Sequence, residues 1–210
     1  MSSTLETAGN QRAATNSEAN PSSNLPYVKS ITAELNAGVS DAVIATCTAH
    51  LVERGDDRSY FEQRMKAAAD ATTELATDLF TSHGRLLAEH RSPTAAPYGT
   101  VDWGEALDSD DVLVFEHIKV AKAHRRKGVA KNLVGGIFDR AASDGVQLSV
   151  FVAPGALESE YGDYTGEERK RVIAEQLDIC VQFWHSLGFR RVAQTNWLAL
   201  KVTPGGVEAE

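Results

Sequence analysis

A basic segment around Gly128 is the part of the sequence with the clearest chemical potential. It reads HRRKGVAK from residue 124 to residue 131, in a chain whose formal net charge is −8 at pH 7. Positive side chains oppose the dipole at a helix N-terminus, so they cost free energy there unless an anion offsets them. Glycine also lets the backbone approach a ligand closely. The segment therefore predicts a phosphate or pyrophosphate site. The alternative is a solvated basic helix start.

The residues on both sides of this segment place it between a strand and a helix. DVLVFEHIKV, residues 111–120, is the clearest strand pattern in the chain. The following helix has one apolar face formed by Val129, Leu133, Val134, Ile137, Phe138 and Ala141. Neither a Walker loop nor a dinucleotide-binding G-x-G-x-x-G pattern is present.

The strand–loop–helix unit resembles the GNAT superfamily of acyl-CoA N-acyltransferases. The family's pyrophosphate loop, Q/R-x-x-G-x-G/A, matches residues 125–130, and the strand ends five positions earlier at Val120. FWHSLGFRRV, residues 183–192, is similar to the family's late FYxxLGF segment. The resemblance covers residues 111–202, and the chain as a whole looks like fungal members of the superfamily.

The resemblance implies an enzyme that transfers an acetyl group directly from acetyl-CoA to a primary amine, without a metal. Acetyl-CoA would be a co-substrate, and the acceptor a small molecule or a peptide. The strand before the loop would be splayed, so that its backbone binds the pantetheine arm. The residues implied to contact the coenzyme are Ile118, Lys119, Val120, Arg125, Arg126, Lys127, Gly128, Val129, Ala130, Lys131 and Trp184.

The catalytic base is expected on the strand before the loop. Glu116 lies where many family members carry a glutamate or histidine that faces the amine, and His117 is its neighbour. Strand alternation predicts that Val114, Glu116 and Ile118 share one face and that His117 lies on the other. The alternatives are a half-exposed strand carboxylate and a histidine packed against a helix.

The chain departs from the family pattern at Trp184. Family members carry there a tyrosine that reprotonates the departing thiolate, whereas an indole N–H is not a usable acid. Either another group, such as Tyr161 or Tyr164, takes that role, or the thiolate leaves unassisted. Trp103, Tyr161 and Tyr164 could line an acceptor pocket. Two acidic clusters could steer a cationic amine or could be solvated loops. The first cluster is Asp102, Glu105, Asp108, Asp110 and Asp111, and the second is Glu158, Glu160, Asp163, Glu167 and Glu168.

The remaining patterns predict an α/β layered domain over residues 27–203, with a disordered tail at 1–26 and a flexible tail at 204–210. Through the resemblance, its central sheet would be mixed and mostly antiparallel, with flanking helices. Strands are expected at 27–35, 41–54, 84–90, 111–120, 146–154, 189–194 and 197–202. Helices are expected at 59–80, from 129 to the DG pair at 144–145, and before Gly188. Loops are expected at 91–110 and 154–170. One side of the last helix would carry the apolar residues Val172, Ile173, Leu177, Cys180, Val181, Trp184 and Leu187.

The composition narrows the functional classes. The acidic balance argues against nucleic-acid binding. No signal-peptide pattern and no apolar run of membrane-spanning length is present, so we expect a cytoplasmic or nuclear protein without a membrane partner, monomeric or homodimeric. Cys47 and Cys180 are expected to be reduced thiols. Two alternatives stay open: a non-catalytic acyl-CoA-binding or sensing domain, and an interaction module that uses the basic segment to bind nucleic acid.

Overall fold

A single eight-stranded sheet organises the computed structural model, which describes residues 14–18, 27–37, 42–91, 101–142, 145–203 and 206–207. The strand order is β1-β2-β3-β4-β5-β7-β6, and β8 pairs with β7. Every pairing is antiparallel except that of β4 with β5. The strands are β1 Ala14–Glu18, β2 Val28–Asn36, β3 Val43–Val52, β4 Asp111–Val120, β5 Leu148–Val152, β6 Arg190–Arg191, β7 Leu198–Thr203 and β8 Gly206–Val207.

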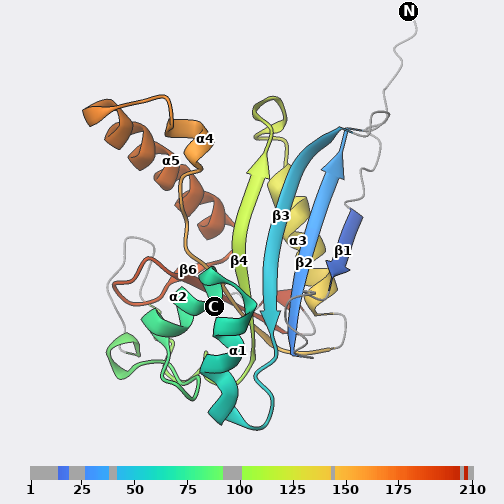
Figure 1. Cartoon of the computed structure of the whole chain (residues 1–210), viewed down its shortest axis with the longest axis vertical. Helices are drawn as coiled ribbons and strands as arrows, with labels where there is room; N and C mark the ends of the chain where they lie inside the picture. The colour runs from blue at the N-terminus through green and yellow to red at the C-terminus, as the bar shows by residue number, and fades with distance from the viewer. Residues whose placement is uncertain are drawn as a thin grey trace, which may run out of the picture.

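Helices lie on both faces of this sheet and beside it (Figure 1). Helix α3, Val129–Ala141, covers one face, and α1, Phe61–Ala68, with α2, Asp70–Leu79, covers the other. Helix α4, Glu158–Tyr161, and the long α5, Gly166–Ser186, lie to the side of β4. Short 3₁₀ turns are Arg58–Tyr60, Ala88–His90 and Lys122–His124. This arrangement confirms the predicted layered α/β class with a mostly antiparallel sheet.

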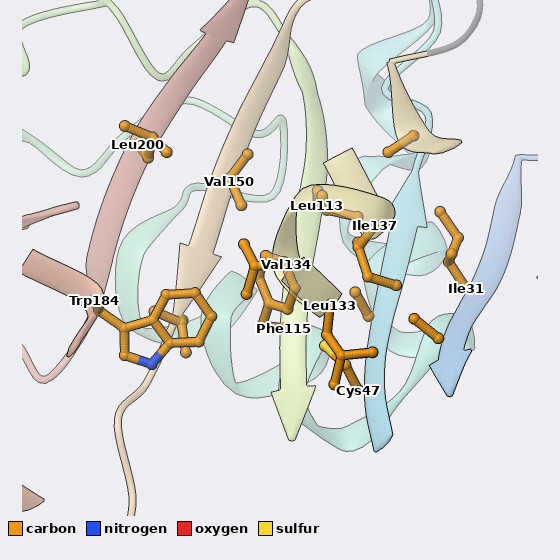
Figure 2. Packing of buried hydrophobic residues seen from close by; sticks show 14 of the residues in the cluster. Ile31, Cys47, Leu113, Phe115, Leu133, Val134, Ile137, Val150, Trp184 and Leu200 are labelled. Carbon is orange, nitrogen blue, oxygen red and sulfur yellow. The ribbon is translucent and has the colours of Figure 1, made fainter. Parts of the chain in front are cut away.

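The first hydrophobic core lies between α3 and the sheet. Leu133, Val134 and Ile137 point from α3 onto β4, where Leu113 and Phe115 meet them (Figure 2). These five side chains are at most 3% exposed. The predicted apolar face of this helix is therefore confirmed, and it fixes the start of α3 against β4. Gly145 follows the helix with a left-handed φ of 72°.

The second core lies on the opposite face, under α1 and α2. The expected single helix over 59–80 is wrong, because Ala69 has extended backbone (φ −165°, ψ 169°) and separates the two helices. The Thr72 hydroxyl accepts a hydrogen bond from the Ala69 N–H, which caps the start of α2. Both helices still bury their apolar faces, with Met65 and Leu75 fully enclosed.

The expected strand over 84–90 is also wrong. Leu86 makes a single bridge with Phe80, and a 3₁₀ turn follows at Ala88–His90. Buried Arg54 donates hydrogen bonds to the carbonyls of Gly84, Leu107, Asp108 and Asp110, so this segment and the end of the loop before β4 are tied to one side chain. Burial lowers the pKa of Arg54 to about 10.

The chain ends differ from the predicted tails. Residues 14–18 form β1, which pairs antiparallel with β2, and residues 206–207 form β8 against β7. The apolar content of residues 1–26 gave no sign of this, because backbone pairing to a neighbouring strand needs no apolar side chain. The rest of both predicted tails lies outside the described residues.

Two segments in the last third of the chain differ from the prediction, because one strand is shorter and one loop contains helix. The strand predicted over 189–194 is reduced to β6, while the loop predicted over 154–170 contains α4 and the first turn of α5. Of the apolar residues expected to share one side of α5, only Trp184 is buried, and Leu177 is 39% exposed. The helix therefore stands largely clear of the sheet.

Candidate functional site

The strands β4 and β5 part at the middle of the sheet. Their parallel pairing runs from Asp111 and Leu148 to Phe115 and Val152 and stops there. On its other edge, β4 stays paired with β3 as far as Val120. Among the residues that the structure describes, the edge of β4 over residues 116–120 that faces away from β3 therefore has no strand partner.

A cleft of about 700 Å³ lies where the two strands part. One wall is the second half of β4, and another is the loop and first turn of α3. The segment 153–157 after β5, Glu160 of α4 and one side of α5 complete it. All the predicted coenzyme and catalytic residues line this cleft except Lys119 and Lys127.

The first turn of α3 presents uncapped backbone amides to the cleft. Gly128 is the N-cap residue, no side chain caps the helix, and its left-handed backbone (φ 78°, ψ 0°) suits glycine. A side chain added at Gly128 would meet nothing within 4 Å, so the space beside it is open. Exposed Arg126 and Lys131 also line the cleft. The geometry is that of an anion site at a helix N-terminus.

Arg125 is held in the cleft wall by an acidic residue of α4. Its Nη2 lies 2.7 Å from Glu160 Oε1 and its Nη1 3.2 Å from Oε2, while its Nε donates to the Val120 carbonyl at 3.0 Å. Lys122 Nζ lies 3.5 Å from the same carboxylate. Hydrogen bonding from Arg125 holds the pKa of Glu160 below its usual value. Arg125, which the sequence predicts to bind phosphate, is thus paired with the Glu160 carboxylate.

A β-bulge places Glu116 and His117 on the same face of the sheet. Thr48 pairs with His117 and Ala49 with Phe115, so Glu116 is the extra residue on β4. The predicted alternation is therefore wrong after Glu116, because a bulge shifts its phase by one residue. Ile118 packs on the α3 side, opposite Val114, and His117 does not point away from Glu116. Both polar side chains line the cleft.

Glu116 is the better held of the two polar side chains. Its Oε2 lies 3.0 Å from Nε2 of His50, whose Nδ1 lies 3.1 Å from the Ser30 hydroxyl. The nearest side-chain partner of His117 is the Thr48 hydroxyl, 3.5 Å from Nε2, which is at the limit of a hydrogen bond. The structure thus gives Glu116 a defined position at the cleft.

Trp184 forms the aromatic floor of the cleft. It is 5% exposed, and its ring centroid lies 4.8 Å from that of Phe189, 5.1 Å from Phe115 and 5.2 Å from Phe183. Such packing stabilises the site and leaves no acid at this position. Tyr161 and Tyr164, the alternative acids, do not line the cleft, and Arg169 stacks on Tyr161.

One side of α5 is a wall of the cleft. Gln176, Ile179, Cys180, Phe183 and Trp184 follow helical spacing and all line it. The Cys180 thiol donates to the Gly155 carbonyl at 3.5 Å, and burial raises the pKa of the thiol. This wall explains why the apolar pattern of α5 is not matched by burial in the core.

Four of the other residues suggested for the acceptor have structural partners instead. Asp108 accepts from the Leu86 amide and from Arg91, Asp110 from Ser149 and Lys201, and Asp111 from the Arg54 amide. Trp103 is buried and donates to the Arg191 carbonyl. None of these residues lines the cleft, so they are not part of its recognition surface.

Sequence reasoning missed several contributors to the site. Glu160 was grouped with loop acids, and its contact with Arg125 joins positions 35 residues apart. His50 and Ser30 lie on neighbouring strands. The alternation of each strand does not show that His50 contacts Glu116. The wall at 153–157 follows a predicted strand and carries only small and apolar residues, with no chemical signal.

No protein-family model matches this chain, and no curated protein matches it. Within the described ranges, no helix has the length and apolar character needed to cross a membrane.

Proposed function

We propose that the protein is an N-acetyltransferase that moves an acetyl group from acetyl-CoA to a primary amine by direct transfer. One observation carries the proposal: the uncapped start of α3 and the unpaired edge of β4 open into one cleft, with Glu116 on its wall. A phosphate site, a strand edge able to bind an amide-containing chain and a carboxylate are thereby combined within reach of one extended ligand.

The pyrophosphate of the coenzyme would lie at the start of α3. Backbone amides after Gly128 would donate to its oxygens, and the exposed cations Arg126 and Lys131 would add charge-assisted hydrogen bonds. Arg125 would join them on exchanging Glu160 for a phosphate oxygen. Lys119 and Lys127 lie outside the cleft lining, so their role would be limited to their backbone or to long-range attraction.

The pantetheine arm would lie along the unpaired edge of β4. Its amide groups match the backbone groups that residues 116–119 direct away from β3, in the way that a peptide extends a sheet, whereas the Val120 carbonyl already accepts from Arg125 Nε. Ile118 and Val120 border this edge, and Trp184 closes the floor. Such a placement directs the thioester toward the bulge, where Glu116 and His117 stand.

The transfer needs one base and no protein nucleophile, because the thioester is already activated. Glu116 accepts one proton from the ammonium, and the freed amine attacks the thioester carbonyl carbon. The C–N bond forms, the C–S bond breaks, and the second nitrogen proton ends on the coenzyme sulfur. A backbone N–H at the bulge would stabilise the oxyanion. Because a thiol has a pKa of about 8.5, the thiolate can leave without an acid at Trp184.

A second candidate function is a non-catalytic acyl-CoA-binding domain. The buried, stacked Trp184 favours it, because the residue that the related family uses as an acid is replaced by a side chain fixed in packing. Both functions require the coenzyme site, and only the first releases thiol.

The test has two parts. Purified protein should gain thermal stability with acetyl-CoA by mass action. It should also release thiol from acetyl-CoA with at least one member of a panel of a small amine, a polyamine, an amino acid and a peptide with a free N-terminus. The matched variant is Gly128→Asp, which adds a negative charge and a strained side chain at the anion site.

Three outcomes separate the possibilities. Binding with thiol release that Gly128→Asp abolishes supports the acetyltransferase. Binding without thiol release for any amine favours the non-catalytic domain. A folded Gly128→Asp variant with unchanged coenzyme affinity contradicts the anion site altogether.

A further inference from the structure

We infer that His50 is a positioning residue that holds Glu116 in place for proton transfer, an inference that rests on the proposed function. It goes beyond the site as predicted because His50 belongs to β3 and does not line the cleft. The carboxylate that would touch the amine is Glu116, and His50 acts through it.

The burial of His50 calls for an explanation. Its side chain is 8% exposed, whereas that of Glu116 is 41% exposed. A buried imidazole costs free energy unless both ring nitrogens are hydrogen-bonded. Here Nε2 lies 3.0 Å from Glu116 Oε2, and Nδ1 lies 3.1 Å from Ser30 Oγ. Both nitrogens therefore have partners, one of them at the cleft.

The partners fix the direction of the hydrogen bonds. A carboxylate only accepts, so the proton between His50 and Glu116 belongs to His50 Nε2. In the neutral ring Nδ1 is then an acceptor, and Ser30 donates its hydroxyl proton to it. The chain runs from Ser30 through His50 to Glu116, and it selects one tautomer of the ring.

The sheet register builds this chain from three strands. Ser30 of β2 is the cross-strand partner of His50, and His50 is the partner of Val114 on β4. Glu116, two residues beyond Val114, lies on the same face at the bulge. Val28, Val52 and Val114 of this face belong to the second core. His50 stands where that core gives way to the cleft.

The hydrogen bond from His50 leaves one carboxylate oxygen of Glu116 available to accept a proton. With Oε2 engaged by a buried donor, the carboxylate cannot rotate freely, and Oε1 stays available for a proton from an incoming ammonium. A half-exposed glutamate without such a donor would sample several rotamers. Displacing a catalytic group by about 1 Å can cost up to 10²-fold in rate. The expected loss without His50 is therefore in kcat, with coenzyme binding unchanged.

The experiment uses the full chain with acetyl-CoA and the best amine of the panel. His50→Leu removes both hydrogen bonds at nearly constant volume. His50→Gln is the matched control, because its amide N–H can replace Nε2 as the donor to Glu116. Each is made in the wild-type protein and in Glu116→Gln. We expect His50→Leu to lower kcat by about 10- to 100-fold with the KM for acetyl-CoA unchanged. His50→Gln should recover most of that loss.

The double mutant separates positioning from general stability. If His50 acts through Glu116, His50→Leu should cause little further loss in the Glu116→Gln background. The same fold-loss in both backgrounds, or a wild-type kcat in His50→Leu, overturns the inference. Should His50→Leu fail to fold, Ser30→Ala carries the test in the same two backgrounds: a kcat loss confined to the Glu116 background supports the role, and an unchanged kcat overturns it.

The two levels of proposal fail in different ways. Absence of thiol release from the wild-type protein with every amine overturns the proposed function, and the role of His50 with it. Thiol release that is indifferent to His50 overturns only the role of His50. Acetyl-CoA affinity, measured in parallel on each variant, shows that the fold and the anion site are intact.

Discussion

Strand β4 has two halves that differ in what lies beside them. From Val112 to Phe115 it is paired on both edges, and these side chains are buried. From His117 to Val120 its only strand partner within the described residues is β3, and the side chains from Glu116 to Val120 are exposed or half-buried. The bulge at Glu116 marks the boundary. One strand therefore builds the core with its first half and the cleft with its second.

The helices beside the two halves differ in the same way. Both α3 and α5 carry apolar residues at helical spacing, but α3 buries its side against the sheet and α5 buries only Trp184. The cleft-facing residues of α5 form a wall that a ligand would cover. The difference teaches that amphipathic spacing shows which residues share a side of a helix, and not what covers that side.

The sharpest contrast concerns the open half of β4. Glu116→Gln keeps the shape and removes the basicity, so we expect kcat/KM to fall by roughly 10²- to 10⁴-fold with acetyl-CoA affinity preserved. Activity should partly return at high pH, where more of the amine is neutral. His117→Gln is the matched neighbour and should matter much less. A near-normal Glu116→Gln beside a crippled, folded His117→Gln would move the base to His117.

Mutations in α3 and in α5 should differ in their effect on the free energy of unfolding. Leu133→Ala in α3 opens a cavity in the first core and should lower the free energy of unfolding by about 2–5 kcal/mol. Leu177→Ala in α5 is the control, since Leu177 is 39% exposed and does not line the cleft, and should change it by less than about 0.5 kcal/mol. Urea unfolding measures both. Equal losses would show that α5 packs as firmly as α3.

The ion pair between Arg125 of the basic loop and Glu160 of α4 should limit anion binding at the cleft. Glu160→Gln leaves Arg125 free of a competing carboxylate, so affinity for coenzyme A and for inorganic pyrophosphate should rise by about two- to five-fold, the scale of a weak ion pair. Glu158→Gln, on the same short helix but outside the cleft lining, removes a charge without that contact and should do less. Weaker binding in Glu160→Gln would mean that Glu160 positions Arg125 for the ligand.

The same ion pair should give a pH dependence of known sign. The pKa of Glu160 is lower in the folded protein than in the unfolded chain, so the pair stabilises the fold fully above the unfolded value of about 4.3. That stabilisation is lost as the pH falls through the lower folded value. The melting temperatures of wild-type protein and Glu160→Gln should therefore converge in acid. A difference that persists there would trace to packing.

The two cysteines should report the core and the cleft separately. Cys47 lies in the first core, where burial raises the pKa of its thiol to about 12, so it should resist alkylation until the protein unfolds. Cys180 lines the cleft and should react slowly, and coenzyme A should slow it further. Mass spectrometry after timed labelling distinguishes the two sites. Labelling of Cys180 that ignores coenzyme A would place the ligand elsewhere.

The sequence by itself determined the central unit of this protein. The apolar run of β4 and its end at Val120 are readable from local pattern, as are the glycine at the start of α3 and the buried side of that helix. Each depends on residues within a few turns or strand steps of one another. For the same reason, the sequence alone places the basic loop at a helix N-terminus and predicts an anion there.

Only the tertiary structure decided what these residues meet. The break at Ala69, the bulge at Glu116 and the pairing of residues 14–18 with β2 depend on long-range contacts that leave no periodic signal. Arg125 meets Glu160 across 35 positions, and Glu116 meets His50 across 66. Such contacts are set by strand order and by where two strands part. Local spacing can place a side chain on a face, but only the folded chain brings its partner to it.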